Sequence, residues 1–478
     1  MIDPIVIVLT GMFVVIGGII FLRLHAFIAL LIAAFVVGLI TPENAIEQYA
    51  LSGGMSPAEA SRLAESSIGA RIARAFGNTT AQIGILIAMA AVIGKCLLQS
   101  GAAERIVRSM IRVTGEEKSA IAFSSGSFFL AIPVFFDTVF YLMIPLAKAT
   151  ALRIGKNYLL LVLAIAGGAA MAHSLVPPTP GPLFLVSEMH IPIHMMMIGG
   201  IIVGAITVTS GYGYAVWANR KWPVPLRDSL EAPLSEMKAK ARIETHQLPA
   251  LWLSLLPILV PVVFISINGV AGAFVSYESP FTVVDMLISA INFIGEVNTA
   301  LIAGGLIALF ILVRSPNVGK EGVTKSIQEA LSSGGMIILI IAAGGAFGAM
   351  LQQTGVSARI ADLTAGYQMA LIPLAFSITA VIRTAQGSAT VAMITAAGIL
   401  SGMASSGNLG FHVLYLGLAV ACGSKLIPWM NDSGFWIVCK MSTLTEVEAL
   451  KTFSVMMTIM GITGVVVILI AAWLFPLV

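Results

Sequence analysis

Several ionisable side chains lie inside stretches of sequence that are otherwise apolar enough to cross a lipid bilayer. The five that are candidates for function are Asp137, His173, Arg383, Lys425 and Asp432. Ionisable groups are costly inside a membrane and are found there mainly where they bind or carry something. The residue types around each one indicate its chemistry, and the interrupted stretches that hold them indicate how the chain brings them together.

Asp137 is the first candidate for a proton carrier. It is the only charged residue in FFLAIPVFFDTVFYLMIPLA, and a carboxyl group in apolar surroundings can exchange a proton during a functional cycle. The alternative is structural: Asp137 caps a helix or pairs with a lysine. Asp432 is the second candidate for proton coupling, although Asp432 and Lys425 can also neutralise each other.

Arg383 is the candidate for binding a negatively charged substrate. A guanidinium group keeps its charge and can hold a carboxylate with two parallel hydrogen bonds. Arg383 is followed by Gly387 and Ser388, small residues that allow a tight turn where the backbone can approach a ligand. The alternative for Arg383 is an ion pair with Asp137 or Asp432.

The other candidate ligands are polar or small residues near two interruptions of the apolar pattern. Hydroxyl, amide and imidazole groups can bind the hydroxyls of a polar solute. We expect substrate contacts from these residues in addition to Arg383: His173, Thr179, Gly181, Ser388, Thr390, Asn431 and Ser433. We expect no catalytic residue and no metal site, because the sequence has no Walker motif, no HExxH and no zinc-like Cys/His spacing.

The two interruptions are HSLVPPTPGP (173–182) and SKLIPWMNDSGF (424–435). Proline lacks a backbone donor and clashes with the preceding turn, so a helix must break there. In hydrocarbon the freed backbone groups need partners from the protein or from a cavity. We therefore expect functional helix breaks at about 174–182 and 425–434.

The composition identifies a polytopic membrane protein of the all-α class. Of the 478 residues, 58% are hydrophobic and only 10% are charged, and the mean hydropathy is +0.98. An ordinary soluble domain has about 25% charged residues. The apolar runs have about the length of a membrane-spanning helix and do not alternate, which excludes a β-barrel. The lipid bilayer is therefore an expected partner, and no feature points to nucleic acid.

Two apolar stretches, about 119–147 and 369–404, are too long and too interrupted to be single spans. We interpret both as re-entrant helical hairpins that leave the membrane on the side they entered. With this interpretation, most Lys and Arg residues fall in short loops on one side, as the positive-inside rule requires. That side is the cytoplasm, and both termini are predicted to be periplasmic.

The chain contains a repeat. GKCLLQSGAAERI (94–106) recurs as GAMLQQTGVSARI (348–360), and each copy is followed by a predicted hairpin and a helix break. In the predicted topology the copies cross the membrane in opposite directions. We expect two inverted halves, 1–217 and 249–478, joined by a cytoplasmic linker at 218–248. Each half holds about five transmembrane segments, one of them broken, and one hairpin, as in secondary transporters.

Two segments with mixed charges at helical spacing, 57–77 and 316–332, lie at equivalent positions in the two halves. A helix with one apolar and one charged face lies in the plane of the membrane surface. We expect both segments to be separate interfacial helices.

The motifs LVPPTPGP, VIRTAQGSATVAMITAAGI and PWMNDSGFWIV, with the repeated LLQSG and RI elements, resemble the GntP family of gluconate:H⁺ symporters in the ion transporter superfamily. The resemblance covers nearly the whole chain in order. It implies proton-coupled uptake of a small sugar acid across the bacterial inner membrane. It also implies a homodimer with an elevator-like movement of the hairpin-bearing domain, with H⁺ as the coupling ion and no cofactor.

Two residues depart from the family pattern. The family often has a glutamate at the position of Asp137 and a second histidine at the position of Thr179. Both changes alter the size of the predicted binding pocket.

Our leading hypothesis is uptake of a gluconate-like polyhydroxy carboxylate by alternating access, with Asp137 and Asp432 as the proton-coupling residues. A sodium-coupled carboxylate symporter or antiporter on the same fold is the alternative. An intramembrane hydrolase would need Ser127 or Ser388 with His173, but neither serine lies in a recognisable nucleophile turn.

Overall fold

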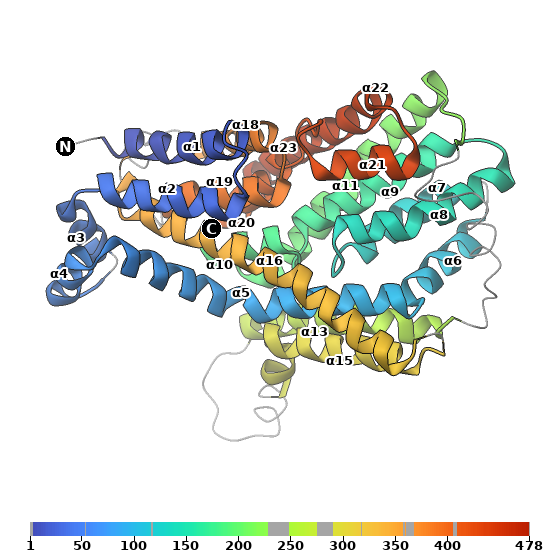
Figure 1. Cartoon of the computed structure of the whole chain (residues 1–478), viewed down its shortest axis with the longest axis horizontal. Coiled ribbons are helices and arrows are strands. Elements are labelled where there is room, and N and C mark those ends of the chain that lie inside the picture. The colour runs from blue at the N-terminus through green and yellow to red at the C-terminus, as the bar shows by residue number, and fades with distance from the viewer. Residues whose placement is uncertain are drawn as a thin grey trace.

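The described part of the chain is built from helices. The computed structural model describes residues 3–477 except 53, 116–117, 228–247, 275–289, 317, 357–358, 360–367 and 405–408. No strand occurs among these residues, so the expectation of an all-α protein is confirmed for them. Figure 1 shows that most long helices run roughly along the longest axis of the molecule.

The helices before the predicted linker are α1 (Pro4–Ile20), α2 (Ala26–Ile40), α3 (Glu43–Ser52), α4 (Pro57–Glu65), α5 (Ile68–Gln99), α6 (Ala102–Thr114), α7 (Ser119–Leu130), α8 (Phe136–Ile154), α9 (Tyr158–Leu175), α10 (Pro180–Glu188) and α11 (Ile193–Lys221). Those after it are α13 (Leu251–Phe274), α15 (Val297–Arg314), α16 (Lys320–Gln352), η2 (Gln368–Ala370), α18 (Leu371–Gln386), α19 (Ala389–Ala404), α20 (Val413–Gly423), α21 (Ser433–Ser442), α22 (Glu446–Ala449), η3 (Leu450–Ser454) and α23 (Val455–Leu474). Most of the predicted linker, 218–248, lies outside the described residues.

Seven helical segments of the described chain are long and apolar enough to cross a membrane. They are Ile68–Gln99, Tyr158–Glu188, Ile193–Lys221, Leu251–Asn268, Val297–Arg314, Lys320–Gln352 and Glu446–Leu474. An eighth is obtained if α2 and α3, which are bent by 101° relative to each other, count as one span. The chain is a multi-pass membrane protein.

Two helix pairs reverse direction at short turns. Residues 131–135 join α7 to α8, and Gly387 and Ser388 join α18 to α19. Gly387 has φ = +84°, a conformation that glycine adopts without strain. These pairs lie where the sequence predicts hairpins, at 119–147 and 369–404. The first pair is longer than predicted, because α8 continues to Ile154. Figure 1 shows α7 and α8 toward one end of the molecule and α18 and α19 toward the other.

Both proline-containing stretches interrupt helices. Residues 176–179 separate α9 from α10 where the sequence predicts a break at 174–182. Residues 424–432 separate α20 from α21 where it predicts a break at 425–434. Pro177 and Pro178 follow the end of α9, because proline cannot donate to the preceding turn of a helix. Pro180 begins α10, because proline fits the first turn.

The repeated motif has the same local geometry in both copies. Gly101 and Gly355 have φ angles of +78° and +76°. The hydroxyls of Ser100 and Thr354, one residue earlier, accept hydrogen bonds of 3.4 and 3.2 Å from the amide two residues later. These turns end α5 and α16, which pack against each other and run in opposite directions (Figure 1).

The expectation of separate interfacial helices is wrong for most of the two segments. Residues 57–65 form the short helix α4, but 68–77 begin α5 and 320–332 begin α16. No proline separates the polar part of either helix from its apolar part, so the helix continues. α5 has 32 residues and α16 has 33, which at 1.5 Å per residue gives ~50 Å, longer than the ~30 Å hydrocarbon core.

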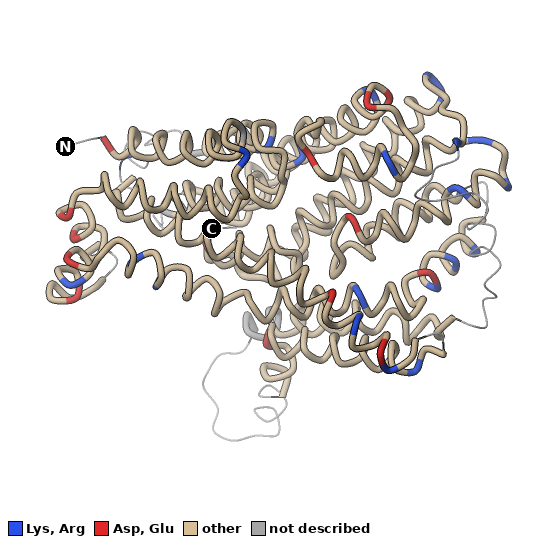
Figure 2. The backbone as a smooth tube through the Cα atoms, in the orientation of Figure 1, with Lys and Arg blue, Asp and Glu red and all other residues tan. Residues whose placement is uncertain are grey.

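Charges are distributed unevenly along the molecule. Figure 2 shows Lys and Arg gathered at the end that holds α6, the last turn of α11 and the start of α16. Asp and Glu gather at the opposite end, around α3 and α4. The two ends therefore face environments that differ in their preference for positive charge.

Candidate substrate site

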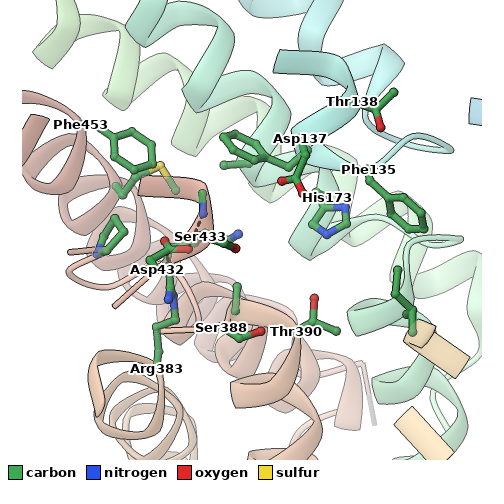
Figure 3. A pocket seen from close by; sticks show the side chains of 18 of the residues that line it. Phe135, Asp137, Thr138, His173, Arg383, Ser388, Thr390, Asp432, Ser433 and Phe453 are labelled. Atoms are coloured by element: carbon green, nitrogen blue, oxygen red, sulfur yellow. Dashed lines mark hydrogen bonds and ion pairs between the residues drawn. The ribbon is translucent and has the colours of Figure 1, made fainter. Parts of the chain in front are cut away.

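The two turns and the second helix break meet at a polar pocket of about 280 Å³. Its lining includes eight of the residues singled out from the sequence: Asp137, His173, Arg383, Ser388, Thr390, Lys425, Asp432 and Ser433. In Figure 3, Asp137 and His173 lie on one side of the space, and Arg383, Asp432 and Ser388 lie on the other. Small-molecule sites occupy roughly 300–1,000 Å³, so the pocket suits a small solute.

Arg383 is held by protein groups. It lies in the last turn of α18, where its Nε donates to the carbonyl of Ser424 over 2.9 Å, Nη1 donates to the carbonyl of Gly387, and Nη2 pairs with Oδ2 of Asp432. The alternative of an ion pair with Asp432 is therefore the arrangement observed. All three guanidinium nitrogens have acceptors, so the charge of Arg383 is matched within the protein.

Asp432 connects this ion pair to the start of α21. It is the N-cap of that helix, and its Oδ1 accepts a hydrogen bond of 2.8 Å from the amide of Gly434. An N-cap carboxylate satisfies a backbone donor that the first turn of a helix leaves free. Asp432 therefore has a partner for each carboxylate oxygen.

Lys425 differs from Arg383 in its pairing. It follows the end of α20, is buried, and lines the pocket. Within the described part of the chain, no ion pair of 4.0 Å or less involves Lys425. Lys425 thus offers the pocket a positive charge that Arg383 does not.

Asp137 and His173 face the pocket from the first half of the chain. Asp137 lies in the first turn of α8 and is exposed to the pocket. His173 is the only residue of α9 that is not buried, and its ring meets that of Phe135 edge to face, with centroids 6.1 Å apart. Its Nδ1 is buried and has no hydrogen-bond partner, so it can bond to a bound solute.

Three helices begin at the pocket, and their first residues line it. They are α8 with Asp137, α19 with Thr390, and α21 with Ser433. The N-terminal end of a helix carries partial positive charge and free backbone donors. Ser388 caps α19 by accepting a hydrogen bond of 3.3 Å from the amide of Val391. The pocket can therefore attract an anion through the backbone as well as through Lys425.

Three predicted substrate residues are not among those that line the pocket. The hydroxyl of Thr179 donates over 2.7 Å to the carbonyl of Val176. Gly181 faces Met393, whose Cε lies 2.1 Å from the position a Cβ would take, so a side chain would not fit there. Asn431 donates to the carbonyls of Thr384 (2.9 Å) and Ala385 (3.1 Å) and supports the turn between α18 and α19.

The structure adds lining residues that carry no signal in the sequence. Ser333 and Ile337 of α16, and Phe453 and Met457 near η3, complete the wall. η3 is a π-helical turn, a distortion that often occurs at functional sites. A serine in a small-residue stretch and a phenylalanine in an apolar helix look like packing residues, and only the local helix geometry turns them toward the pocket.

The proposed hydrolase residue Ser127 lies elsewhere. Its hydroxyl donates to the carbonyl of Ser124 over 3.0 Å, and it is not among the residues that line the pocket. Its Oγ packs 2.3 Å from the position of a Cβ on Gly168, which makes it part of the contact between α7 and α9. Ser388 lines the pocket together with His173.

The fold resembles that of a known transporter. The crystal structure of the YdaH transporter of Alcanivorax borkumensis superposes with a TM-score of 0.58, covering 84% of this chain and 88% of that one at 17% identity. At this level of identity the likeness shows the fold alone.

Several proteins named as permeases or transporters are similar to this chain over nearly the whole length of both sequences. An uncharacterized permease of Haemophilus influenzae is 34% identical over 98% of this chain and 92% of its own. The gluconate permease of Pseudomonas aeruginosa is 31% identical over 94% and 92%, and the low-affinity gluconate transporter of Escherichia coli K12 is 28% identical over 94% of each chain. The hydrolase hypothesis is therefore wrong. The profile of GntP family permeases matches residues 3–474, and this chain belongs to that family of membrane transporters.

Proposed function

We propose that this protein takes up a gluconate-like sugar acid together with a proton. The observation that carries the proposal is a small pocket in which two acidic and two basic side chains meet several hydroxyls and three helix N-termini. Relatives named as gluconate permeases and transporters support a sugar acid as the solute. The pocket gives such a solute both a place for its carboxylate and partners for its hydroxyls.

Lys425 is the residue we assign to the substrate carboxylate. Arg383, the residue favoured from the sequence, has its charge matched by Asp432, whereas Lys425 has no ion-pair partner within the described residues. The N-termini of α19 and α21 add backbone donors beside it. Ser388, Thr390, Ser433 and the free Nδ1 of His173 then meet the hydroxyls of the sugar acid.

Charge balance gives a reason for proton coupling. The lining holds Asp137 and Asp432 against Arg383 and Lys425, so the pocket has no net charge when it is empty and Asp137 is ionised. An added monovalent anion leaves one unmatched negative charge, and a charge carried across hydrocarbon costs several kcal/mol. A proton on Asp137, which has no ion pair in the described chain, restores neutrality. One proton then accompanies each monovalent anion.

We further propose two inverted halves, 1–217 and 249–478, that move the pocket by an elevator-like mechanism in a homodimer. The matched turns at Gly101 and Gly355 and the opposite directions of α5 and α16 support the inversion. The gathering of Lys and Arg at one end supports a cytoplasmic position for that end and periplasmic termini, in the bacterial inner membrane.

Uptake of labelled gluconate into proteoliposomes tests the function. An imposed inward proton gradient is expected to drive accumulation by the native protein. Asp137→Asn is expected to abolish accumulation and to keep gluconate exchange, whereas Asp137→Glu, which retains a protonatable group, is expected to keep both. Normal uphill uptake by Asp137→Asn would remove Asp137 from the mechanism. If replacing sodium by choline stopped uptake while the proton gradient had no effect, the sodium-coupled alternative would be correct.

A further inference from the structure

The C-terminal end of α11 carries the features of a membrane–water interface. The rings of Tyr214 and Trp217 lie 5.4 Å apart, and those of Trp217 and Trp222 lie 5.2 Å apart. The Nζ of Lys221 lies 4.7 and 4.9 Å from the centres of the two Trp rings. Trp and Tyr gather where lipid headgroups meet the acyl chains, and Lys and Arg mark the cytoplasmic side. This end of α11 is therefore at headgroup level.

A second cavity opens beside this end of α11, with a volume of about 640 Å³. It lies between the turn that joins α8 to α9, the last turns of α11, and the stretch from Pro223 to Leu226. We call it the basic cavity, because Lys156 and Arg220 line it and none of the described residues around it is acidic. No ion pair in the described part of the chain engages either cation.

The basic cavity is held open by hydrogen bonds between the elements around it. Asn157 has φ = +67° at the start of α9, and its Oδ1 accepts a hydrogen bond of 3.0 Å from Nδ2 of Asn219. Oδ1 of Asn219 accepts one of 3.2 Å from the amide of Leu160. Arg227, directly after the lining stretch, forms a two-pronged pair with Glu448 at 2.7 and 2.8 Å. The cavity is thus preformed.

The lining of the basic cavity combines polar and apolar side chains. Its polar members include Lys156, Arg220 and the two asparagines, and its apolar members include Leu152, Val224 and Leu226. A free inorganic anion would use only the polar residues. A phospholipid uses both kinds, because its phosphate is joined to acyl chains. Lys and Arg near an anionic membrane surface attract its phosphate groups.

We propose that the basic cavity binds the headgroup of an anionic phospholipid. Lys156 and Arg220 hold the phosphate, and the apolar lining residues contact the first part of the acyl chains. The lipid joins the α8–α9 turn to the end of α11 and adds to the Asn157–Asn219 contact. The site is separate from the substrate pocket, so its occupancy does not depend on which solute is transported.

Native mass spectrometry of the detergent-purified full chain tests the proposal. The probes are short-chain phosphatidylglycerol, short-chain phosphatidylcholine and inorganic phosphate. The native protein is expected to retain phosphatidylglycerol and not phosphatidylcholine. The double variant Lys156→Ala/Arg220→Ala is expected to bind phosphatidylglycerol roughly tenfold or more weakly. The control Arg62→Ala/Arg74→Ala removes two exposed cations near the opposite end and is expected to bind like the native protein.

Thermal unfolding in the presence of the same probes gives a second readout, because a ligand that binds the folded state raises the midpoint. Lys156→Gln/Arg220→Gln serves if the alanine variant does not fold. Equal phosphatidylglycerol binding by native and cavity variants would overturn the proposal. Displacement of the lipid by millimolar inorganic phosphate, or equal binding of phosphatidylcholine, would also overturn it, because the site would then recognise free anions or lipid in general.

Discussion

Arg383 and Asp432 form an ion pair that joins the end of α18 to the start of α21. The same guanidinium donates to the carbonyls of Gly387 and Ser424, so one side chain fixes the α18–α19 turn and the second helix break together. Buried charges need partners and additional hydrogen bonds to be tolerated. The pair therefore shapes the pocket, and for this reason we propose Lys425 as the residue that meets the substrate carboxylate.

Asp432→Asn tests this structural role. Asparagine still caps α21, because Asn and Asp are equally good N-caps, but it leaves the charge of Arg383 unmatched. Removing one partner of a buried ion pair lowers the free energy of unfolding by about 3–5 kcal/mol. The unfolding midpoint in detergent is therefore expected to fall strongly. The double variant Arg383→Met/Asp432→Asn is the control, because it removes the unmatched charge and is expected to recover part of the stability. An equal loss in both variants would contradict the ion-pair explanation.

Lys425→Met is expected to weaken gluconate binding without a comparable loss of stability. A hydrogen bond to a charged group contributes about 1.5–3 kcal/mol, which corresponds to roughly tenfold to a hundredfold in affinity. Lys425→Arg keeps the charge and is expected to retain most of the binding. Calorimetric titration of each purified variant with gluconate measures these two affinities. Unchanged gluconate affinity in Lys425→Met would mean that a group other than Lys425 binds the substrate carboxylate.

Local sequence signals located eight of the residues that line the pocket, including all of its ionisable side chains. Asp137, His173 and Lys425 are polar groups in apolar stretches, and such groups can be recognised without a structure because lipid tolerates them so poorly. The sequence allowed Asp432 to pair with Lys425 or with Arg383 and could not decide between them. Asp432 is seven residues from Lys425 and 49 from Arg383, yet it contacts Arg383. Pairing depends on how α18 packs beside α20, which no local pattern encodes.

Two differences between the predicted contacts and the lining of the pocket have the same cause. Thr179 and Gly181 lie in a helix break, as the substrate contacts were expected to do, but α10 turns them toward Val176 and α19. Ser333 of α16 has no distinguishing neighbours in sequence and still lines the pocket. The fold was more predictable than the site, because span length and helix breaks are set by the bilayer, whereas side-chain direction is set by packing.

Gly387→Ala is expected to distort the α18–α19 turn. The residue has φ = +84°, and an added Cβ would lie 2.2 Å from the carbonyl oxygen of Asn431. The backbone strain alone costs on the order of 1 kcal/mol or more, and the overlap adds to it. Gly335→Ala is a matched control, because its Cβ would meet nothing within 4 Å and alanine favours a helix. The unfolding midpoint and the gluconate affinity are both expected to fall in Gly387→Ala and to stay unchanged in Gly335→Ala.

Glu188 and Gln352 are expected to show energetic coupling across three helices. Nε2 of Gln352 in α16 donates to Oε1 of Glu188 in α10 over 2.7 Å and lies 2.8 Å from Oγ of Ser401 in α19, while Tyr49 donates to Oε1 of Gln352 over 3.0 Å. Removing one partner of such a contact leaves a partly buried polar group unsatisfied, and a fully buried one would cost about 1–3 kcal/mol.

Glu188→Ala and Gln352→Ala are each expected to lower the unfolding midpoint, and the double variant is expected to lower it by less than their sum. Residues in one hydrogen-bond network show coupling energies of about 0.5–3 kcal/mol in such cycles. Glu188→Gln keeps an acceptor for Gln352, so it is expected to cost less than Glu188→Ala. Additive losses would mean that each side chain acts through its own packing. α19 starts at the pocket and α10 starts at the first helix break, and both meet α16 here. A coupled contact would therefore link α10 to the far end of a helix that begins at the pocket.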